Sequence, residues 1–458
     1  MSQEQEKTVT SRREFLRNAA ASAAVTVAAT QVAKSKVYSL APARVIGAND
    51  RIIIGHVGLG GQGTYHLELL KTNSTDGLKN NTEQVAVCDL YVRRKKSAGA
   101  ELGLNDSQMF SDHRKMLENK DIDAVWVTTS DQWHADVAID CMNAGKHVYI
   151  EKPMCKELEE AYRLFDTAKS TKRIVQVGAQ GTSDPKYHQC SDLIKQGNFG
   201  TMVCAQASYN RNSKEGEWNY YTIDPDASPT ATGDGYVDWE TFRRGKGPKA
   251  WDGDRFFRWR KWWSYGSGLV GDLLPHRLYP MMVAMGIPTE GMDGFPMRVS
   301  SMGGLYVQKF KPDGKTPDRD VPDFIDVICD FPGGPSLMLM STCINEEGWT
   351  DTIRMNRATI TLGGDTIDVK PERVWSDVVD ANSVEAPCGE PIDRHERNFL
   401  DAIRGILAKP NLNIDFALRG QIILTLAEMS YRNGAEMYFD PKTRKAWPGK
   451  VSISDKMM

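Results

Sequence analysis

The sequence has 458 residues, of which 40% are hydrophobic and 26% are charged, a composition typical of a globular protein with two or three domains. A formal net charge of −3 excludes an extended basic surface for nucleic acid and is compatible with a small, roughly neutral substrate. The eight cysteines show no CxxC pair and no metal-site spacing, so we expect no bound metal.

The first fifty residues differ from the rest of the chain. Two adjacent arginines, Arg12 and Arg13, precede an uncharged run rich in Ala and Val at residues 19–29. This order is typical of a twin-arginine export signal, which we place at residues 1–43, and it predicts a periplasmic or extracellular protein. A surface helix at the N-terminus is the alternative interpretation. The run is shorter than the ~20 apolar residues that cross a bilayer, so we expect no membrane span.

Short apolar runs then alternate with helical patterns. Strands are predicted at residues 51–57, 84–89, 124–129 and 147–150, and helices from the first strand to about residue 70 and over residues 131–144. Buried strands that alternate with helices indicate a parallel sheet covered on both faces. We therefore predict an α/β fold with a doubly wound Rossmann domain over residues 50–175.

After residue 176 the β segments become longer and are separated by loops rich in Pro, Gly and Asp, notably residues 224–254. Further strands are predicted at residues 203–209 and 325–331, a helical face at Phe399, Leu400, Ile403 and Leu407, and a second helix over residues 417–433. This pattern predicts an α+β domain over residues 176–440 with a large open mixed sheet.

A glycine motif, GLGGQG at residues 58–63, follows the first strand and opens the first helix. The candidate cofactor-binding residues of this motif are Gly58, Gly60, Gly61, Gln62 and Gly63. In this context glycines let backbone N–H groups approach a pyrophosphate at a helix N-terminus. Asp89 ends the second strand, where a carboxylate binds the ribose hydroxyls and favours NAD over NADP. Arg93 and Arg94 weaken that preference, so NADP stays open; an ordinary glycine turn with Asp89 as a helix cap is the alternative.

Two more strand ends supply candidate cofactor contacts. Thr129, Trp133 and His134 follow the third of the predicted strands, and Glu151 and Lys152 follow the fourth, before Pro153. In an open α/β sheet the carboxyl ends of the strands face the ligand crevice. A cis bond before Pro153 would set the direction of Lys152. A packed helical histidine and a surface Lys-Pro pair are the alternative interpretations.

Asp272 and His276 are spaced i, i+4, which places them on one face if the segment is helical. Oxidation of a sugar hydroxyl requires removal of a proton, a task that suits histidine near neutral pH. A nearby ammonium would stabilise the developing alkoxide. Lys152, Asp272 and His276 are therefore the candidate catalytic residues; an acidic residue at a helix start and a core histidine are the alternative.

A dense aromatic and basic cluster covers residues 258–265. Aromatic faces stack on sugar rings and arginines bind hydroxyls, so this region supplies candidate substrate contacts. The candidates are Arg258, Trp259, Trp263 and, outside the cluster, Arg277. The same cluster could form an interdomain or subunit contact, where Trp and Arg are common hot spots.

Together these motifs resemble the Gfo/Idh/MocA family of sugar-active, nicotinamide-dependent oxidoreductases. The likeness includes the glycine motif, the Glu-Lys-Pro tripeptide, the FFRWRKW segment at residues 256–262, the Asp-x-x-x-His pair and RHERNFLD at residues 394–401. The resemblance implies bound NAD(P), a carbohydrate substrate, a catalytic lysine at Lys152, an acid–histidine pair at Asp272 and His276, and a homodimer or homotetramer built through the C-terminal sheet.

One departure from the family pattern opens a second reaction class. Members similar to inositol dehydrogenase often have an Asp three residues after the histidine, where this chain has Tyr279, and residues 276–280 resemble the His-x-x-x-Pro segment of NAD-dependent glycosidases. Free nicotinamide cofactor is scarce outside the cytoplasm, whereas the twin-arginine route passes folded proteins. We therefore expect a sugar oxidoreductase with tightly bound cofactor, with a redox-neutral glycosidase or epimerase and a non-catalytic sugar sensor as alternatives.

Overall fold

The computed structural model describes residues 50–75, 77–387, 389 and 392–449, all within one compact unit. The predicted export signal lies outside these residues. In the described residues no helix is both long and apolar enough to cross a membrane.

The N-terminal half is a six-stranded sheet of order β3-β2-β1-β4-β5-β6 in which every pair is parallel. Its strands and helices are β1 (Ile52–Val57), α2 (Gly61–Thr75), β2 (Thr82–Cys88), α3 (Val92–Leu102), β3 (Met109–Phe110), α4 (His113–Met116), β4 (Ala124–Val127), α5 (Asp131–Asn143), β5 (His147–Ile150), α6 (Leu158–Thr171) and β6 (Val175–Val177). This is the doubly wound order of a Rossmann fold, and it confirms the predicted fold class. All four residues of β4 are buried, as expected for a strand covered on both faces.

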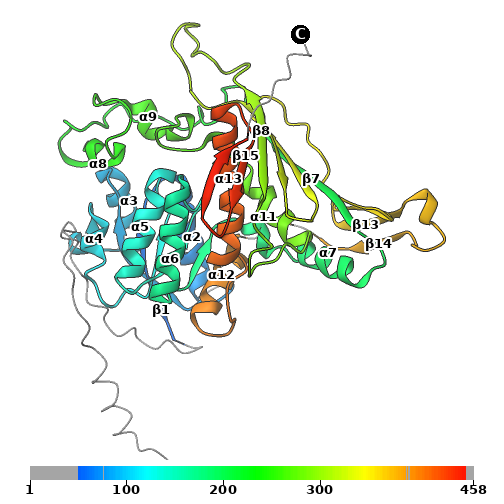
Figure 1. The fold of residues 1–458 in the computed structure, drawn as a ribbon. Coiled ribbons are helices and arrows are strands. Elements are labelled where there is room, and N and C mark those ends of the chain that lie inside the picture. The colour runs from blue at the N-terminus through cyan, green and yellow to red at the C-terminus, as the bar shows by residue number, and fades with distance from the viewer. Residues whose placement is uncertain (1–49, 76, 388, 390–391, 450–458) are drawn as a thin grey trace, which may run out of the picture. The chain divides into compact units, whose positions relative to one another are not determined.

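The C-terminal half is a ten-stranded mixed sheet of order β14-β13-β12-β11-β7-β10-β9-β8-β15-β16, in which β7 and β10 are parallel neighbours. Its elements are α7 (Pro185–Gln196), β7 (Met202–Asn210), α8 (Trp239–Arg243), α9 (Gly253–Phe257), α10 (Gly268–Asp272), α11 (Pro275–Ala284), β8 (Arg298–Gly304), β9 (Phe324–Asp330), β10 (Ser336–Thr342), β11 (Thr352–Met355), β12 (Ala358–Thr361), β13 (Thr366–Pro371), β14 (Asn382–Glu385), α12 (Ile392–Ile403), α13 (Ile414–Asn433), β15 (Met437–Asp440) and β16 (Lys445–Pro448). Figure 1 shows this sheet beside the Rossmann half.

Helix α12 returns from the C-terminal half to cover the Rossmann sheet. Phe399 and Leu400 pack with Trp126 and Tyr149, whose rings stack at 5.4 Å. The helix ends at Ile403 rather than extending to residue 407, because Gly405 has a φ of +72° and turns the chain. The segment predicted as a loop at residues 224–254 also contains α8 and a short 3-10 helix, Gly233–Gly235.

Candidate active site

The turn between β1 and α2 has room only for glycine at two positions. Gly58 has a φ of +91°, and a Cβ atom on it would lie 2.6 Å from the carbonyl group of Thr128. A Cβ atom on Gly63 would lie 2.1 Å from the carbonyl oxygen of Gly58. A cavity beside this turn is lined by Gly58, Gly60, Gly61 and Gln62. The unpaired N–H groups at the start of α2 therefore lie next to the cavity, as binding of a pyrophosphate requires.

Replacing Gly63 with alanine is expected to lower the melting temperature and to abolish dinucleotide binding, because the new methyl group overlaps the Gly58 carbonyl. Such overpacking costs about 1–3 kcal/mol. Gly60→Ala is the matched control: its Cβ would lie 3.8 Å from the nearest atom, on Arg94, so the fold should be unaffected. Thermal melts and NADH fluorescence titrations of both variants test this. Unchanged NADH affinity in Gly63→Ala would contradict it.

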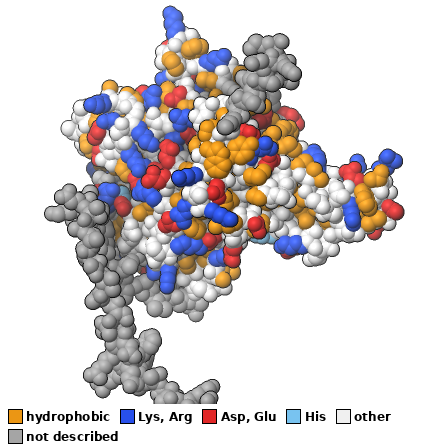
Figure 2. Space-filling model, viewed as in Figure 1, with side chains coloured by type: hydrophobic (Ala, Val, Ile, Leu, Met, Phe, Trp, Pro, Cys, Tyr) orange, Lys and Arg blue, Asp and Glu red, His pale blue; other side chains and the backbone are white. Residues whose placement is uncertain are grey.

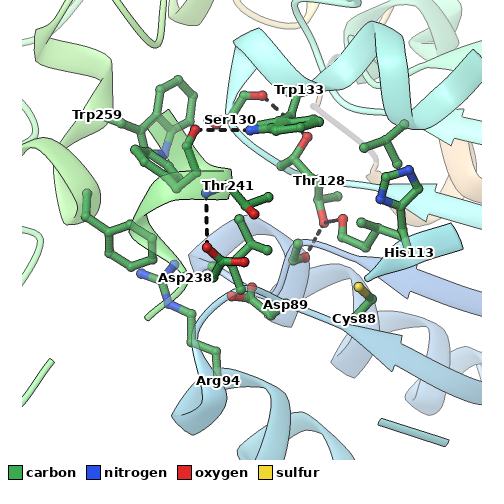
Figure 3. A pocket seen from close by; sticks show the side chains of 18 of the residues that line it. Cys88, Asp89, Arg94, His113, Thr128, Ser130, Trp133, Asp238, Thr241 and Trp259 are labelled. Carbon is green, nitrogen blue, oxygen red and sulfur yellow. Dashed lines mark hydrogen bonds between the residues drawn. The ribbon is translucent and has the colours of Figure 1, made fainter. Parts of the chain in front are cut away.

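The cavity has a volume of about 310 Å³ and extends along the carboxyl ends of β1, β2 and β4 (Figure 3). Asp89, after β2, accepts the backbone N–H of Leu59 at 2.6 Å and that of Tyr91 at 2.8 Å. Each carboxylate oxygen retains a lone pair for a ribose hydroxyl. Arg94 lines the cavity near Gly60, whereas Arg93 is paired with Asp224 at 2.5 Å. The glycine turn, the helix N-terminus and Asp89 together fit a dinucleotide.

At the end of β4, Thr129 and Trp133 line the cavity, whereas His134 lies beneath it. The ring nitrogens of His134 lie 2.6 Å from the carbonyl oxygen of Pro153 and 3.0 Å from that of Thr129. Burial lowers the pKa of His134 to about 4, although both carbonyls favour the protonated ring. His134 therefore connects the ends of β4 and β5 and makes no contact with the cavity.

The Glu151-Lys152-Pro153 segment follows β5, and the Lys152–Pro153 bond is cis. The two charged side chains point to different partners. The Lys152 ammonium donates to the Asp272 carboxylate at 3.1 Å and to its backbone carbonyl at 2.5 Å. Glu151 instead accepts from His66 at 2.7 Å and from Gln62 at 3.3 Å. Lys152 thus binds Asp272 of the C-terminal half, while Glu151 belongs to a buried network with α2.

Asp272, the last residue of α10, accepts four hydrogen bonds from three residues, two of them from Lys152. Besides Lys152, its carboxylate accepts from the Arg260 guanidinium at 3.0 Å and from the Trp218 indole N–H at 2.8 Å. Burial acts to raise the pKa of Asp272, but the charges of Lys152 and Arg260 outweigh it and hold that pKa well below its usual range. Asp272 is therefore an anion that directs the Lys152 ammonium.

His276 is the second residue of the neighbouring helix α11, and its ring stacks on Tyr209 of β7 at a centroid distance of 4.7 Å and an interplanar angle of 14°. Arg277 lies 5.1 Å from the Tyr209 ring centroid and lines a second cavity of about 540 Å³, together with Tyr209 and Trp349. Arg260 lines the first cavity and Tyr209 the second. Lys152, Asp272 and His276 line neither cavity themselves; Asp272 contacts Arg260 of the first cavity and His276 stacks on Tyr209 of the second.

Asp131, the first residue of α5, lies beside this group. Its carboxylate accepts the backbone N–H of Ser267 at 3.1 Å rather than capping its own helix. Burial raises the pKa of Asp131 to about 7, against the charge of Arg260. A buried carboxyl group with this pKa can exchange a proton near neutral pH.

The residues of the aromatic and basic cluster lie in different surroundings and have different contacts. Trp259 lines the first cavity, with the Arg260 guanidinium 4.3 Å from its ring centroid. Arg258 donates to the carbonyl oxygens of Asn219 and Tyr221 and so holds that loop. Trp263 lines neither cavity; it lies 5.5 Å from the Arg432 guanidinium of α13 and packs on the core. The Lys156 ammonium of the Rossmann half lies 5.7 Å from the same ring centroid, so Trp263 contacts both halves of the chain, in line with the alternative of an interdomain contact.

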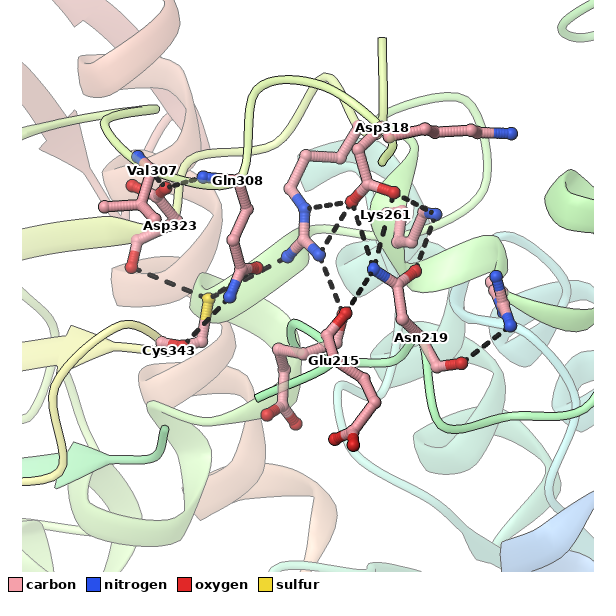
Figure 4. A network of polar contacts seen from close by, with 12 residues as sticks. Glu215, Asn219, Lys261, Val307, Gln308, Asp318, Asp323 and Cys343 are labelled. Atoms are coloured by element: carbon pink, nitrogen blue, oxygen red, sulfur yellow. Dashed lines mark hydrogen bonds and ion pairs between the residues drawn. The ribbon is translucent and has the colours of Figure 1, made fainter. Parts of the chain in front are cut away.

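A buried ion-pair network keeps the 217–221 loop in place. The fully buried ammonium of Lys261 lies 3.1 Å from Asp254 and 2.9 Å from Asp318 (Figure 4). It also donates to the side chain of Asn219 at 2.9 Å. In this loop Trp218 is fully buried and has a φ of +66°, an unusual conformation for a bulky residue. The network supports the backbone that brings the Trp218 indole to Asp272.

Sequence reasoning missed several residues of the site. Trp218, Arg260 and Tyr209 make contacts with Asp272 or His276, and His66 contacts Glu151, yet none of the four follows a strand-end or catalytic spacing. Arg260 stood within the cluster at residues 258–265 without an assigned role. The other three gave no local signal, because their partners are distant in the chain.

The strand order, the glycine turn and the acidic residue after β2 define a Rossmann dinucleotide-binding protein. Residues 52–179 match the model of the Gfo/Idh/MocA oxidoreductase family, an NAD-binding Rossmann fold. The match confirms the predicted cofactor type and the family resemblance for this part of the chain.

Two curated relatives extend the comparison. The inositol 2-dehydrogenase of Salmonella paratyphi B is 33% identical over 165 residues, 36% of this chain and 47% of that protein. The alpha-N-acetylgalactosaminidase of Shewanella oneidensis is 27% identical over 239 residues, 46% of this chain and 50% of that protein. The chain therefore spans about half the length of these relatives.

The WlbA dehydrogenase from Bordetella pertussis, solved with NADH and UDP-GlcNAcA, has a similar structure. The TM-score is 0.61 at 19% identity, and the superposition covers 85% of this chain and 99% of that one. The likeness extends through both halves and concerns the fold.

Proposed function

We propose that the protein is an NAD-dependent oxidoreductase that acts on a sugar or sugar derivative and holds its cofactor tightly. The observation that carries this proposal is the Lys152 ammonium, which Asp272 holds at the carboxyl end of β5, beside the strand that lines the dinucleotide cavity. His276 lies in the helix that follows Asp272, so the chain places a base four residues after the carboxylate that binds the ammonium.

The proposed roles follow from the chemistry of carbinol oxidation, in which a hydride leaves carbon and a proton leaves oxygen. A bound nicotinamide supplies the hydride acceptor. Lys152 donates a hydrogen bond to the reacting oxygen and stabilises its developing negative charge. His276 accepts the hydroxyl proton, and Asp272 keeps the ammonium charged and directed. Arg277, Tyr209 and Trp349 border the cavity in which the rest of the sugar would lie.

NAD rather than NADP is the proposed cofactor. The carboxylate of Asp89 faces the position of the adenosine ribose and would repel a 2′-phosphate. Arg93 is neutralised by Asp224 and Asp234, which removes one of the two cations that argued for NADP.

A redox-neutral glycosidase is the second candidate, favoured by the match to the Shewanella enzyme. In that reaction the hydride taken from a sugar carbon returns to it after the aglycone has left by elimination and water has added. Tyr279 is compatible with either chemistry, because its side chain is fully buried and donates to the Ala417 carbonyl oxygen at 3.2 Å, which gives it a packing role.

We also propose twin-arginine export and a homo-oligomer. The motif at residues 11–17 supports export. Exposed apolar side chains support a subunit contact: Met302 of β8 and Ile328 of β9 are 72% and 46% exposed. Figure 2 shows hydrophobic side chains gathered around the position of β8 and β15.

Native mass spectrometry and absorbance assays on the purified protein distinguish the candidate reactions. Native mass spectrometry is expected to find NAD(H) bound, together with the number of subunits. A panel of free sugars should then change the absorbance at 340 nm without release of nitrophenol from 4-nitrophenyl glycosides. Nitrophenol release at constant 340 nm absorbance would favour the glycosidase, and sugar binding without any turnover would favour a sensor. Failure to bind either nicotinamide dinucleotide would contradict the proposal.

A further inference from the structure

Residues 221–265, which lie between β7 and α10, form a segment with a separate hydrophobic core. We call this segment the roof. Its aromatic core comprises Trp239, Phe242, Phe256, Phe257, Trp262 and Tyr265, with Tyr91 of the Rossmann half packed among them. In Figure 1 its helices α8 and α9 lie over the amino-terminal ends of α3 and α5, which is the side where the parallel strands have their carboxyl ends.

The roof forms one wall of the dinucleotide cavity. Its contributions to the lining are Tyr221, Asp238, Thr241, Phe242, Phe256, Phe257, Trp259 and Arg260. The facing wall is the Rossmann edge with Asp89, Arg94 and Thr128, and Figure 3 shows Asp238 close to Asp89. A ligand that lies along this edge therefore has protein on both sides, including the half that contacts Asp89.

On one side the roof is attached to the β2–α3 connection. Arg93 pairs with Asp224 at 2.5 Å and with Asp234 at 3.3 Å. The hydroxyl of Tyr91 also donates to Asp224 at 2.5 Å. Two backbone hydrogen bonds continue the contact, from Val92 to the carbonyl of Tyr236 at 3.0 Å and from Asp238 to that of Leu90 at 3.0 Å.

On the other side the roof is attached to α5 and α6. Arg244 pairs with Asp136 and, at 3.1 Å, with Glu160. The carbonyl oxygen of Phe242 accepts from the Gln132 amide at 2.7 Å and from the Trp133 indole at 3.1 Å. The roof is thus attached at two separate places, one at the start of α3 and the other on α5 and α6.

We propose that the roof is a fixed cover of the adenosine half of the dinucleotide and keeps the cofactor bound through successive turnovers. This inference rests on the proposed function. Release then requires separation of the roof from at least one of its two attachments. The overall reaction must accordingly return the hydride and proton within the same site, either to the same sugar or to a second carbonyl substrate of the same class.

The test is the dissociation rate of NADH. The full-length protein is loaded with NADH and mixed with excess NAD⁺, and the loss of bound NADH fluorescence is followed. The wild-type protein should retain NADH for minutes or longer. Arg93→Ala and Arg244→Ala each remove the ion pairs of one attachment and should speed dissociation by about tenfold or more, because most effects of interface mutations lie in the off-rate.

Arg163→Ala is the matched control. Arg163 pairs with Asp136, as Arg244 does, but lies on α6 and forms no ion pair with the roof within the described part of the chain, so its removal should leave the rate unchanged. NADH exchange within a second in the wild-type protein, or equal rates in all variants, would overturn this inference and leave the proposed function intact. A wild-type protein that binds no NADH would overturn both. If a roof variant fails to fold, the dissociation rate of NADH from the wild-type protein by itself still tests whether the cofactor is retained.

Discussion

Replacing Lys152 with methionine is expected to lower the turnover of a sugar substrate by about 10²–10³-fold, the range typical for loss of one donor that stabilises a developing oxyanion. The ammonium that would stabilise charge on the reacting oxygen is lost. Asp272 keeps Arg260 and Trp218 as partners, so the surrounding structure should persist. Steady-state turnover and NADH affinity, measured on the same preparation, check this result.

Lys156→Met is the matched control for this prediction. Lys156 follows on the same segment and is also buried in an ion pair, at 2.8 Å from Glu428, but its partner belongs to α13 and lines neither cavity. Its loss should lower the melting temperature with little effect on turnover per folded molecule. If the two variants lost activity equally, or if Lys152→Met retained full turnover, Lys152 would have no part in the chemistry.

Replacing His66 with leucine is expected to cost about 3–5 kcal/mol of stability, the range for removing one member of a buried charge network. His66 is fully buried between Glu151 and Glu396, with both carboxylate oxygens 2.7 Å from its ring nitrogens. Without the imidazolium, the two buried carboxyl groups lose the cation that lies between them. Urea unfolding at neutral pH measures the loss, and His66→Gln, which keeps an N–H donor, should lose less.

The same network predicts the pH dependence of stability. Burial opposes protonation of His66, but the two glutamates outweigh it and raise its pKa from 6.5 to about 9. A group with a raised pKa contributes stability that is complete below pH 6.5 and is lost as the pH rises through 9. Wild-type stability should therefore fall over this interval, and the fall should be absent in His66→Gln. An equal fall in both proteins would show that His66 does not cause it.

The roof and the proposed export have a common consequence. A protein that folds before it crosses a membrane could take up its dinucleotide first, and the two attachments of the roof would oppose its loss afterwards. Redox-neutral chemistry, or coupled oxidation and reduction, is the reaction class consistent with such retention.

The sequence by itself determined the Rossmann half, the glycine turn and the candidate residues at three strand ends. These features are local: hydrophobic periodicity sets the alternating elements, Gly58 and Asp89 each stand directly after a strand, and Lys152 is the second residue after one. Parallel strands end at a common edge, so strand position alone brings such residues to one crevice. The sequence also predicted that the C-terminal half contains a large mixed sheet, but it did not predict the order of the strands in that sheet.

Only the tertiary structure decided which side chains surround Asp272 and what covers the cofactor cavity. Lys152 and Trp218 reach Asp272 from 120 and 54 residues away, and His66 meets Glu396 across 330 residues. No periodicity encodes such contacts, because they depend on how two sheets and the segment between them pack. For the same reason the aromatic cluster could not be divided in advance into a cavity wall at Trp259 and a core contact at Trp263.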